Sequence, residues 1–271
     1  MQGAGNDYVY VDCTTNEISN PNELSVKISD RHFGVGSDGL VLICKSAVAD
    51  FKMRMFNADG SEAQMCGNAA RCIGKYVYEK GLTTQTAITL ETPAGTKRLQ
   101  LFIENNVVEK VQVDMGAPEL TPAKIPVKVD VAQAVNFPLE IDGRKFNFTA
   151  VSMGNPHAVI FVDDVQNFDV HGIGKSIETH PLFPQKVNVE FVQPLSRTEL
   201  KMRVWERGSG ETWACGTGAC ATLVAASLNN ITDKKATIHL LGGDLEIDWR
   251  EDGHVYMTGG ATTVFEGNYN L

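Results

Sequence analysis

The 271-residue chain lacks the features that would direct it to a membrane or to nucleic acid. No apolar run approaches the roughly 20 residues that a bilayer-spanning helix needs. The net charge is −9 and the pI is near 5.2, with no stripe of lysine and arginine anywhere, so a nucleic-acid footprint is excluded. With 43% hydrophobic and 21% charged residues, the composition is that of a soluble globular protein.

A leader segment and the usual cysteine motifs are also missing. The chain starts without a charged-then-apolar signal, which predicts a cytoplasmic protein whose six cysteines are reduced thiols. No Cys-x-x-Cys pair occurs, and the spacings within 66–72 and 215–220 are not those of zinc ribbons. We therefore expect no metal site. Cys13 and Cys44 lie in apolar runs and are most simply small buried hydrophobes.

What the chain does have is an internal repeat. Segments 52–72 and 201–221 align without a gap at an offset of 149 and share 7 of 21 positions. The shared pairs are Lys52/Lys201, Met53/Met202, Arg54/Arg203, Glu62/Glu211, Cys66/Cys215, Gly67/Gly216 and Ala70/Ala219. A segment repeated twice at a long period predicts two homologous domains, because two copies are too few for a solenoid.

Hydrophobic periodicity and turn residues predict a similar order of elements in each half. In the first half we expect strands at 8–11, 40–44, 52–56, 86–92, 97–104 and 107–114, with helices at 20–33 and 67–80. In the second half we expect strands at 157–162, 187–193, 200–206, 236–241, 244–249 and 254–258, with helices at 167–179 and 216–228.

Each half thus combines many strands with one long helix. A closed antiparallel sheet wrapped on that helix would bury it on all sides, which suits the small apolar residues at 221–226. We predict an α+β fold of two domains related by a pseudo-two-fold axis, the first being 1–115 plus 263–271 and the second 116–262. The tail at 263–271 is long enough to add a strand to the first domain.

One motif is misleading. The segment Gly34-Val-Gly36-Ser-Asp-Gly39 matches the dinucleotide fingerprint letter for letter. That fingerprint requires a strand before it and a helix after it, and here the expected order is reversed. We reject it.

Cys66 and Cys215 are the candidate reactive groups. Each is expected at a helix N-terminus, where free N–H groups and the helix dipole favour a thiolate, and each precedes a glycine that allows close approach of a ligand. The same helix ends can bind a carboxylate at Gly67-Asn68 and Gly216-Thr217. Two thiols facing each other across a cleft suit proton exchange beside a carboxylate, which gives racemisation or epimerisation without a cofactor.

Motifs along nearly the whole chain resemble those of the diaminopimelate epimerase family. They are G3-A-G-N-D-Y8, F56-N-A-D-G-S61, M65-C-G-N-A-A-R-C72, G154-N-P-H157, V204-W-E-R-G-S209, A214-C-G-T-G-A219 and F265-E-G267. The resemblance implies two barrels of mainly antiparallel strands, each around a central helix. It also implies an isomerase that interconverts LL- and meso-diaminopimelate in lysine and peptidoglycan precursor biosynthesis, and a homodimer with Phe265 near the contact.

The resemblance carries roles onto individual residues. Cys66 resembles the family's proton donor and Cys215 its acceptor, with His157 and Glu206 as polar partners beside the thiols. The residues that it implies for substrate binding are Asn6, Asn57, Gly67, Asn68, Asn155, Asn188, Glu206, Arg207, Gly216 and Thr217. Arg207 can form a fork onto a distant carboxylate.

The chain departs from the family pattern in two places and leaves two alternatives. Ala69 stands where the family usually has Gly. Gly39 stands where many members of the family have Gln. The repeat pairs Gly39 with Asn188, Asn57 with Glu206 and Tyr8 with His157, so the site is expected to be asymmetric. The alternatives are a proline or hydroxyproline racemase of the same fold, which would leave Arg207 idle, and a thiol redox module, which would leave the polar residues unexplained.

Overall fold

The computed structural model describes residues 1–270, which divide into two compact units. Unit 1 comprises residues 1–114 and the chain from Thr258 onward, and unit 2 comprises Met115–Met257. The chain rejoins unit 1 at Thr258, earlier than the tail at 263–271 that the sequence analysis assigned to it. Hydrogen bonds explain this, since Thr258 accepts from Gln112 and the carbonyl of Gly260 accepts from Arg71.

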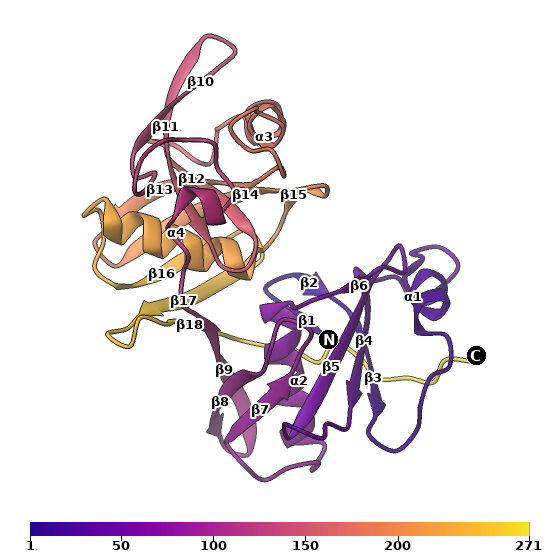
Figure 1. The fold of residues 1–271 in the computed structure, drawn as a ribbon. Helices are drawn as coiled ribbons and strands as arrows, with labels where there is room; N and C mark the ends of the chain where they lie inside the picture. The colour runs from indigo at the N-terminus through magenta and orange to yellow at the C-terminus, as the bar shows by residue number, and fades with distance from the viewer. Residues whose placement is uncertain (271) are drawn as a thin grey trace. The chain divides into compact units, whose positions relative to one another are not determined.

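Each unit has two principal helices and a set of short strands (Figure 1). The elements of unit 1 are β1 (Gln2–Gly3), β2 (Asn6–Asp7), β3 (Val9–Cys13), α1 (Pro21–Ser29), β4 (Gly39–Cys44), β5 (Phe51–Asn57), β6 (Glu62–Ala63), α2 (Gly67–Glu79), β7 (Ala87–Glu91), β8 (Lys97–Glu104) and β9 (Val107–Gly116). Those of unit 2 are a 3₁₀ turn (Pro122–Lys124), β10 (Phe137–Ile141), β11 (Arg144–Ser152), β12 (Pro156–Phe161), α3 (Val170–Glu178), β13 (Asn188–Ser196), β14 (Glu199–Glu206), β15 (Gly210–Thr212), α4 (Gly216–Leu228), β16 (Lys235–Leu240), β17 (Gly243–Trp249) and β18 (Val255–Gly259).

The two units share one topology. In unit 1 the strand order is β3-β4-β5-β7-β8-β9. In unit 2 the matching order is β12-β13-β14-β16-β17-β18, and the hairpin of β11 and β10 is added beside β12. Most neighbours are antiparallel, but β3/β4, β5/β7, β12/β13 and β14/β16 are parallel. A parallel pair needs a crossover, and each of these pairs is connected through a helix. The expected α+β fold of mainly antiparallel strands is therefore confirmed, with four parallel pairs at the helical crossovers.

Helices α2 and α4 form the centre of their units. Helix α4 contacts β11, β12, β13, β16 and β17, strands spread over most of the order in unit 2, so the sheet curls around it. Its residues from Gly218 to Ala226 are all buried, which explains why small side chains fill all sides of this helix. Helix α2 has the same position in the sequence of unit 1 and contacts β1 and β8.

The helix bounds follow local signals with one exception. Helix α4 covers the predicted 216–228, and α2 ends before Gly81, whose φ of +70° needs a glycine. Helix α1 ends at Ser29, four residues short of the predicted 33. The reason is the Asp30 carboxylate, which accepts the backbone N–H groups of His32 and Phe33 and turns the chain.

Two further expectations fail in the described residues. The tail at 263–270 adds no strand. The last strand-like pairing before it is an isolated bridge between Gln2 and Thr262. The hairpin of β10 and β11 was not predicted at all, although its Asp142-Gly143 turn has positive φ at both residues, as a type I′ turn requires. None of the helices within 1–270 is long and apolar enough to cross a membrane.

Candidate active site

Cys215 is the N-cap residue of α4 in unit 2. Its backbone is extended, with φ −125° and ψ 108°, and its Sγ accepts the N–H of Gly218 at 3.4 Å. The first N–H groups of a helix have no partner within the helix, so the sulfur takes the place that a serine or aspartate oxygen usually occupies. The thiol is therefore held at the positive end of the helix, with only 6% of the residue exposed.

Two carboxylates lie near this thiol, one of them at the end of β14. The Glu206 carboxyl hydrogen bonds to the Cys215 thiol and accepts the hydroxyl of Thr212. Burial raises the pKa of Glu206 despite these bonds. Burial also raises the pKa of Cys215 well above its ordinary value, followed by the negative charges of Glu206 and of Glu190, the second carboxylate. The expectation that the helix end makes Cys215 a thiolate is wrong here, because burial and two carboxylates outweigh the helix dipole.

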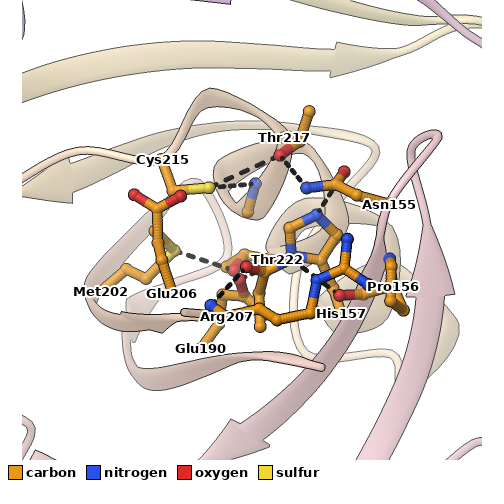
Figure 2. Close-up of polar contacts among 12 residues, drawn as sticks. Asn155, Pro156, His157, Glu190, Met202, Glu206, Arg207, Cys215, Thr217 and Thr222 are labelled. Atoms are coloured by element: carbon orange, nitrogen blue, oxygen red, sulfur yellow. Dashed lines mark hydrogen bonds and ion pairs between the residues drawn. The ribbon is translucent and has the colours of Figure 1, made fainter. Parts of the chain in front are cut away.

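A buried chain of hydrogen bonds reaches the same sulfur from the other side (Figure 2). Glu190 Oε1 contacts His157 Nδ1 at 2.7 Å, and both residues are completely buried. His157 Nε2 contacts Asn155 Oδ1 at 3.0 Å, and Asn155 Nδ2 donates to Thr217 Oγ1 at 3.2 Å. Thr217 Oγ1 lies 3.5 Å from Cys215 Sγ. His157 is thus linked to the thiol through Asn155 and Thr217.

The orientation of the Asn155 amide sets the direction of this chain. Its oxygen faces His157, so Nε2 of the imidazole carries a proton and donates it. The amide nitrogen donates to Thr217, which leaves the threonine hydrogen able to point at the sulfur. With this orientation Thr217 can donate to a Cys215 thiolate.

Asn188 and Arg207 form a second group in unit 2. Asn188 is buried, donates to the carbonyl of Pro156 at 2.9 Å and accepts the backbone N–H of Arg207 at 2.9 Å. Both ends of its amide are therefore bonded to backbone. The exposed Arg207 donates one guanidinium N–H to the carbonyl of Gln185 at 2.9 Å, so its planar head is held near the end of β14.

The equivalent position in unit 1 has a different environment. Cys66 is the N-cap of α2, with φ −139° and ψ 120°, but it makes no side-chain cap. Its Sγ donates to Asn6 Oδ1 at 3.4 Å, and Asn68 Nδ2 donates to the same oxygen at 3.4 Å. Asn6 in turn donates to Asp38 Oδ2 at 2.8 Å. Burial raises the pKa of that Asp38 carboxyl. Gly67 and Asn68 begin the helix beside the thiol and are buried.

Asn57 and Gly39 are strand partners at the end of the β4/β5 pair. Asn57 donates its side-chain N–H to Ser61 Oγ at 3.0 Å. A Cβ on Gly39 would lie 2.0 Å from the carbonyl oxygen of Phe56 and 2.8 Å from the ring of Tyr8. No side chain fits there without moving the backbone, which explains why this chain has no glutamine at Gly39.

Two site residues were not found from the sequence. Glu190 lies in the middle of the apolar strand β13, and a carboxylate in such a strand signals a buried partner, because an unpaired charge is costly there. Asp38 lies within the glycine-rich segment 34–39 that resembles a dinucleotide motif, and its carboxylate accepts from the Asn6 side chain and the backbone N–H of Asp7. Within residues 1–270 no three cysteine, histidine or carboxylate side chains gather as a metal site.

Solved structures define the class of this fold. The chain is similar to a probable proline racemase from Agrobacterium radiobacter K84, with a TM-score of 0.67 and 15% identity over 92% of this chain and 81% of that one. It is similar to a hydroxyproline epimerase from Agrobacterium vitis, with a TM-score of 0.67 and 13% identity over 96% and 86% of the two chains. It is also similar to a Bacillus anthracis phenazine biosynthesis protein of the PhzF family, with a TM-score of 0.66 and 17% identity over 96% of this chain and 92% of that one. The fold is the two-unit α+β fold that these proteins share.

Sequence comparison places the chain more narrowly. A family model described as diaminopimelate epimerase matches residues 1–121 and 149–264. A diaminopimelate epimerase from Acetivibrio thermocellus is 58% identical, covering 100% of this chain and 97% of the relative. A diaminopimelate epimerase from Methanococcus maripaludis is 56% identical, covering 100% of this chain and 98% of the relative. The chain belongs to the diaminopimelate epimerase family.

Proposed function

We propose that the chain interconverts LL- and meso-diaminopimelate by exchanging the proton of one α-carbon between Cys66 and Cys215. The observation that carries the proposal is the placement of one thiol at the N-cap of the central helix in each repeat. The high identity to relatives named diaminopimelate epimerase supports the substrate. Lysine and peptidoglycan precursor biosynthesis follows from that substrate.

The chemistry needs one base and one acid on opposite faces of the α-carbon. The thiolate of one cysteine takes the α-proton, the C–H electron pair stays on carbon, and the thiol of the other cysteine returns a proton to the opposite face. The free N–H groups at Gly67-Asn68 and Gly216-Thr217 would bind the substrate carboxylate and stabilise charge that develops on it. The helix ends thus serve the substrate as well as the sulfur.

Cys215 requires help to ionise because its pKa is raised. Glu206 is the group to accept its proton, since the two side chains are hydrogen bonded and burial raises the pKa of this carboxyl toward that of a useful base. Thr217 then donates to the thiolate, oriented through Asn155 by His157. These are the roles that we propose for His157 and Glu206.

The unreactive end of the substrate carries an ammonium and a carboxylate. Arg207 supplies a planar guanidinium suited to a carboxylate, and Asn188 holds its backbone in place. Asn6, Asn57 and Asn155 supply amide groups that can donate to a carboxylate or accept from an ammonium. A proline-type racemase would make no use of Arg207, and the solved proteins with those names share only 13–15% identity with this chain.

We further propose that the enzyme works without cofactor or metal, in the cytoplasm, as a homodimer. Two thiols and two helix ends suffice for proton transfer, and a reducing compartment keeps the thiols free. The support for dimerisation is the 65% exposure of Phe265, the residue that the family resemblance implies near a dimer contact. Light scattering of the wild type and of Phe265→Ser tests the last point, because the variant should be monomeric.

The decisive experiment follows the α-proton itself. Purified enzyme treated with a chelator and dialysed should exchange the α-hydrogen of LL-diaminopimelate for deuterium in heavy water, and should produce the meso isomer. Proline and hydroxyproline should show no exchange. Exchange into proline, or a requirement for added pyridoxal phosphate or metal, would contradict the proposal.

A further inference from the structure

Cys13 and Cys44 form a pair that the proposed reaction does not use. They are the last residues of β3 and β4, two adjacent parallel strands of unit 1, and they are direct partners in the strand register. Partners in register point to the same face of a sheet. Both side chains accordingly belong to the apolar cluster under α1 that contains Leu24 and Ile28.

The two thiols are close enough to influence each other's ionisation, since Cys44 raises the pKa of Cys13 and Cys13 lowers that of Cys44. Burial raises the pKa of Cys13 to about 11, and the neighbouring Cys44 adds to the shift. The other two cysteines outside the candidate active site, Cys72 and Cys220, are fully buried in α2 and α4 and share no strand register with another thiol.

The backbone already has the spacing that a cross-link needs. Neighbouring strands lie about 4.8 Å apart. A disulfide joins residues whose Cα atoms are about 4.4–6.8 Å apart, so the strand spacing lies within the range for this bond. The sequence alone could not reveal this, because 30 residues separate the two cysteines.

The surroundings also distinguish the two sulfurs. Cys44 is the more exposed of the two, and its partner in the next strand is Lys52. Burial raises the pKa of Cys44, but the charges of Arg54 and Lys52 lower it. Cys44 is therefore the thiol that an oxidant meets first, and Cys13 is the thiol that resolves the product.

We propose that Cys13 and Cys44 are an oxidation site at which a low-molecular-weight disulfide forms an intramolecular Cys13–Cys44 bond. The Cys44 thiolate attacks the small disulfide, giving a mixed disulfide and releasing one small thiol. The Cys13 thiolate then attacks Cys44 Sγ and releases the second small thiol. Two protein thiols are oxidised, and one small disulfide is reduced to two thiols.

The cross-link closes the loop 14–43, which contains α1 and the segment with Asp38. It joins the C-terminal ends of β3 and β4, whereas Tyr8 and Asp38 lie just before their N-terminal ends. Oxidation here should therefore stabilise unit 1 and preserve turnover. A loop of this length predicts a rise of a few degrees in Tm.

The test uses the full chain with Cys66→Ser and Cys215→Ser, so that the candidate catalytic thiols cannot react. Incubation with oxidised glutathione at pH 8.5 should give a species lighter by about 2 Da, as expected for a disulfide, and peptide mapping should find Cys13 joined to Cys44. The rate should rise with pH because the thiolates are the nucleophiles. Dithiothreitol should reverse the mass change and the rise in Tm.

Matched variants make the outcome decisive. Added to that background, Cys44→Ala should abolish the oxidised species, Cys13→Ala should stop at a glutathione adduct on Cys44, and Cys220→Ala should change nothing. With the catalytic thiols restored, Cys13→Ala and Cys44→Ala should each keep wild-type turnover. A stable adduct on Cys44 when both thiols are present, a different pairing, or no reaction would overturn the proposal. The mass and peptide-mapping outcomes do not depend on activity toward diaminopimelate.

Discussion

Cys66 and Cys215 occupy the same position in the repeat and in the topology, yet their surroundings differ in charge. Around Cys66 the neighbours are the amides of Asn6 and Asn68. Around Cys215 they include the carboxylates of Glu206 and Glu190, which raise the pKa of the thiol together with burial. The repeat supplies two equivalent helix ends, and the substitutions around them place carboxylates beside one thiol and amides beside the other.

The repeat register shows which substitutions created the difference. Asn57 in unit 1 corresponds to Glu206 in unit 2, and Val41 corresponds to Glu190. Each change replaces a neutral side chain by a carboxylate in unit 2. At these two positions the carboxylates are thus found in unit 2, and one of them, Glu206, is hydrogen bonded to the thiol of that unit. This asymmetry suits a substrate with one reacting end and one end that is only recognised.

The largest expected effect comes from removing either sulfur. Cys66→Ala and Cys215→Ala should each reduce epimerisation by roughly 10³-fold or more, and the double variant should be no worse, because the residues act as a unit. Deuterium incorporation into LL-diaminopimelate measures the loss. Cys220→Ala is the control and should keep its activity. Substantial turnover in either single variant would show that the two thiols are not an equivalent pair of acid and base.

Glu206→Gln should separate acidity from catalysis. Removing the charge lowers the pKa of Cys215, so alkylation of this thiol in a Cys66→Ser background should reach half its maximal rate at a lower pH. Epimerisation by the otherwise wild-type enzyme should nevertheless fall by about 10²-fold, since the base is gone. If alkylation keeps its wild-type pH dependence, the Glu206 carboxylate is not the charge that controls Cys215.

Arg207→Lys tests recognition of the distant carboxylate. The lysine keeps the charge but loses the planar fork, so KM should rise by about 10- to 100-fold with a smaller change in kcat. Arg197→Lys is the matched control, because Arg197 forms an exposed pair with Asp233 in the same unit. An unchanged KM in Arg207→Lys would assign the carboxylate to another residue.

The smallest effect concerns the buried pair of His157 and Glu190. Glu190→Val gives unit 2 the residue of unit 1 and leaves Nδ1 of His157 without an acceptor, which should cost about 1–3 kcal/mol of unfolding free energy. Glu190→Gln keeps a hydrogen-bonding partner and should lose less. All three tryptophans, at positions 205, 213 and 249, lie in unit 2, so their fluorescence in urea reports this unit. Equal stability of the two variants would mean that His157 needs no partner at this position.

Local sequence signals were reliable where one interaction dominates. Small residues on all sides predicted α4 with its observed bounds, and Gly81 marked the end of α2. The Asp142-Gly143 pair is also a typical turn signal for the β10/β11 hairpin, which the sequence analysis did not predict. Gly34 did not mark the end of α1, which lies at Ser29. The Asp30 side chain competes with the helix for backbone N–H groups and ends it earlier.

The sequence by itself determined that the chain is duplicated, which cysteines begin the two central helices, and to which family it belongs. These properties depend on residue order and on interactions within a few positions of the chain. Only the tertiary structure decided that Glu190 lies against His157, that Cys13 and Cys44 are partners in the strand register, and that Cys215 has a raised pKa. The reason is that strand register brings together residues far apart in sequence, and burial determines how strongly their charges interact.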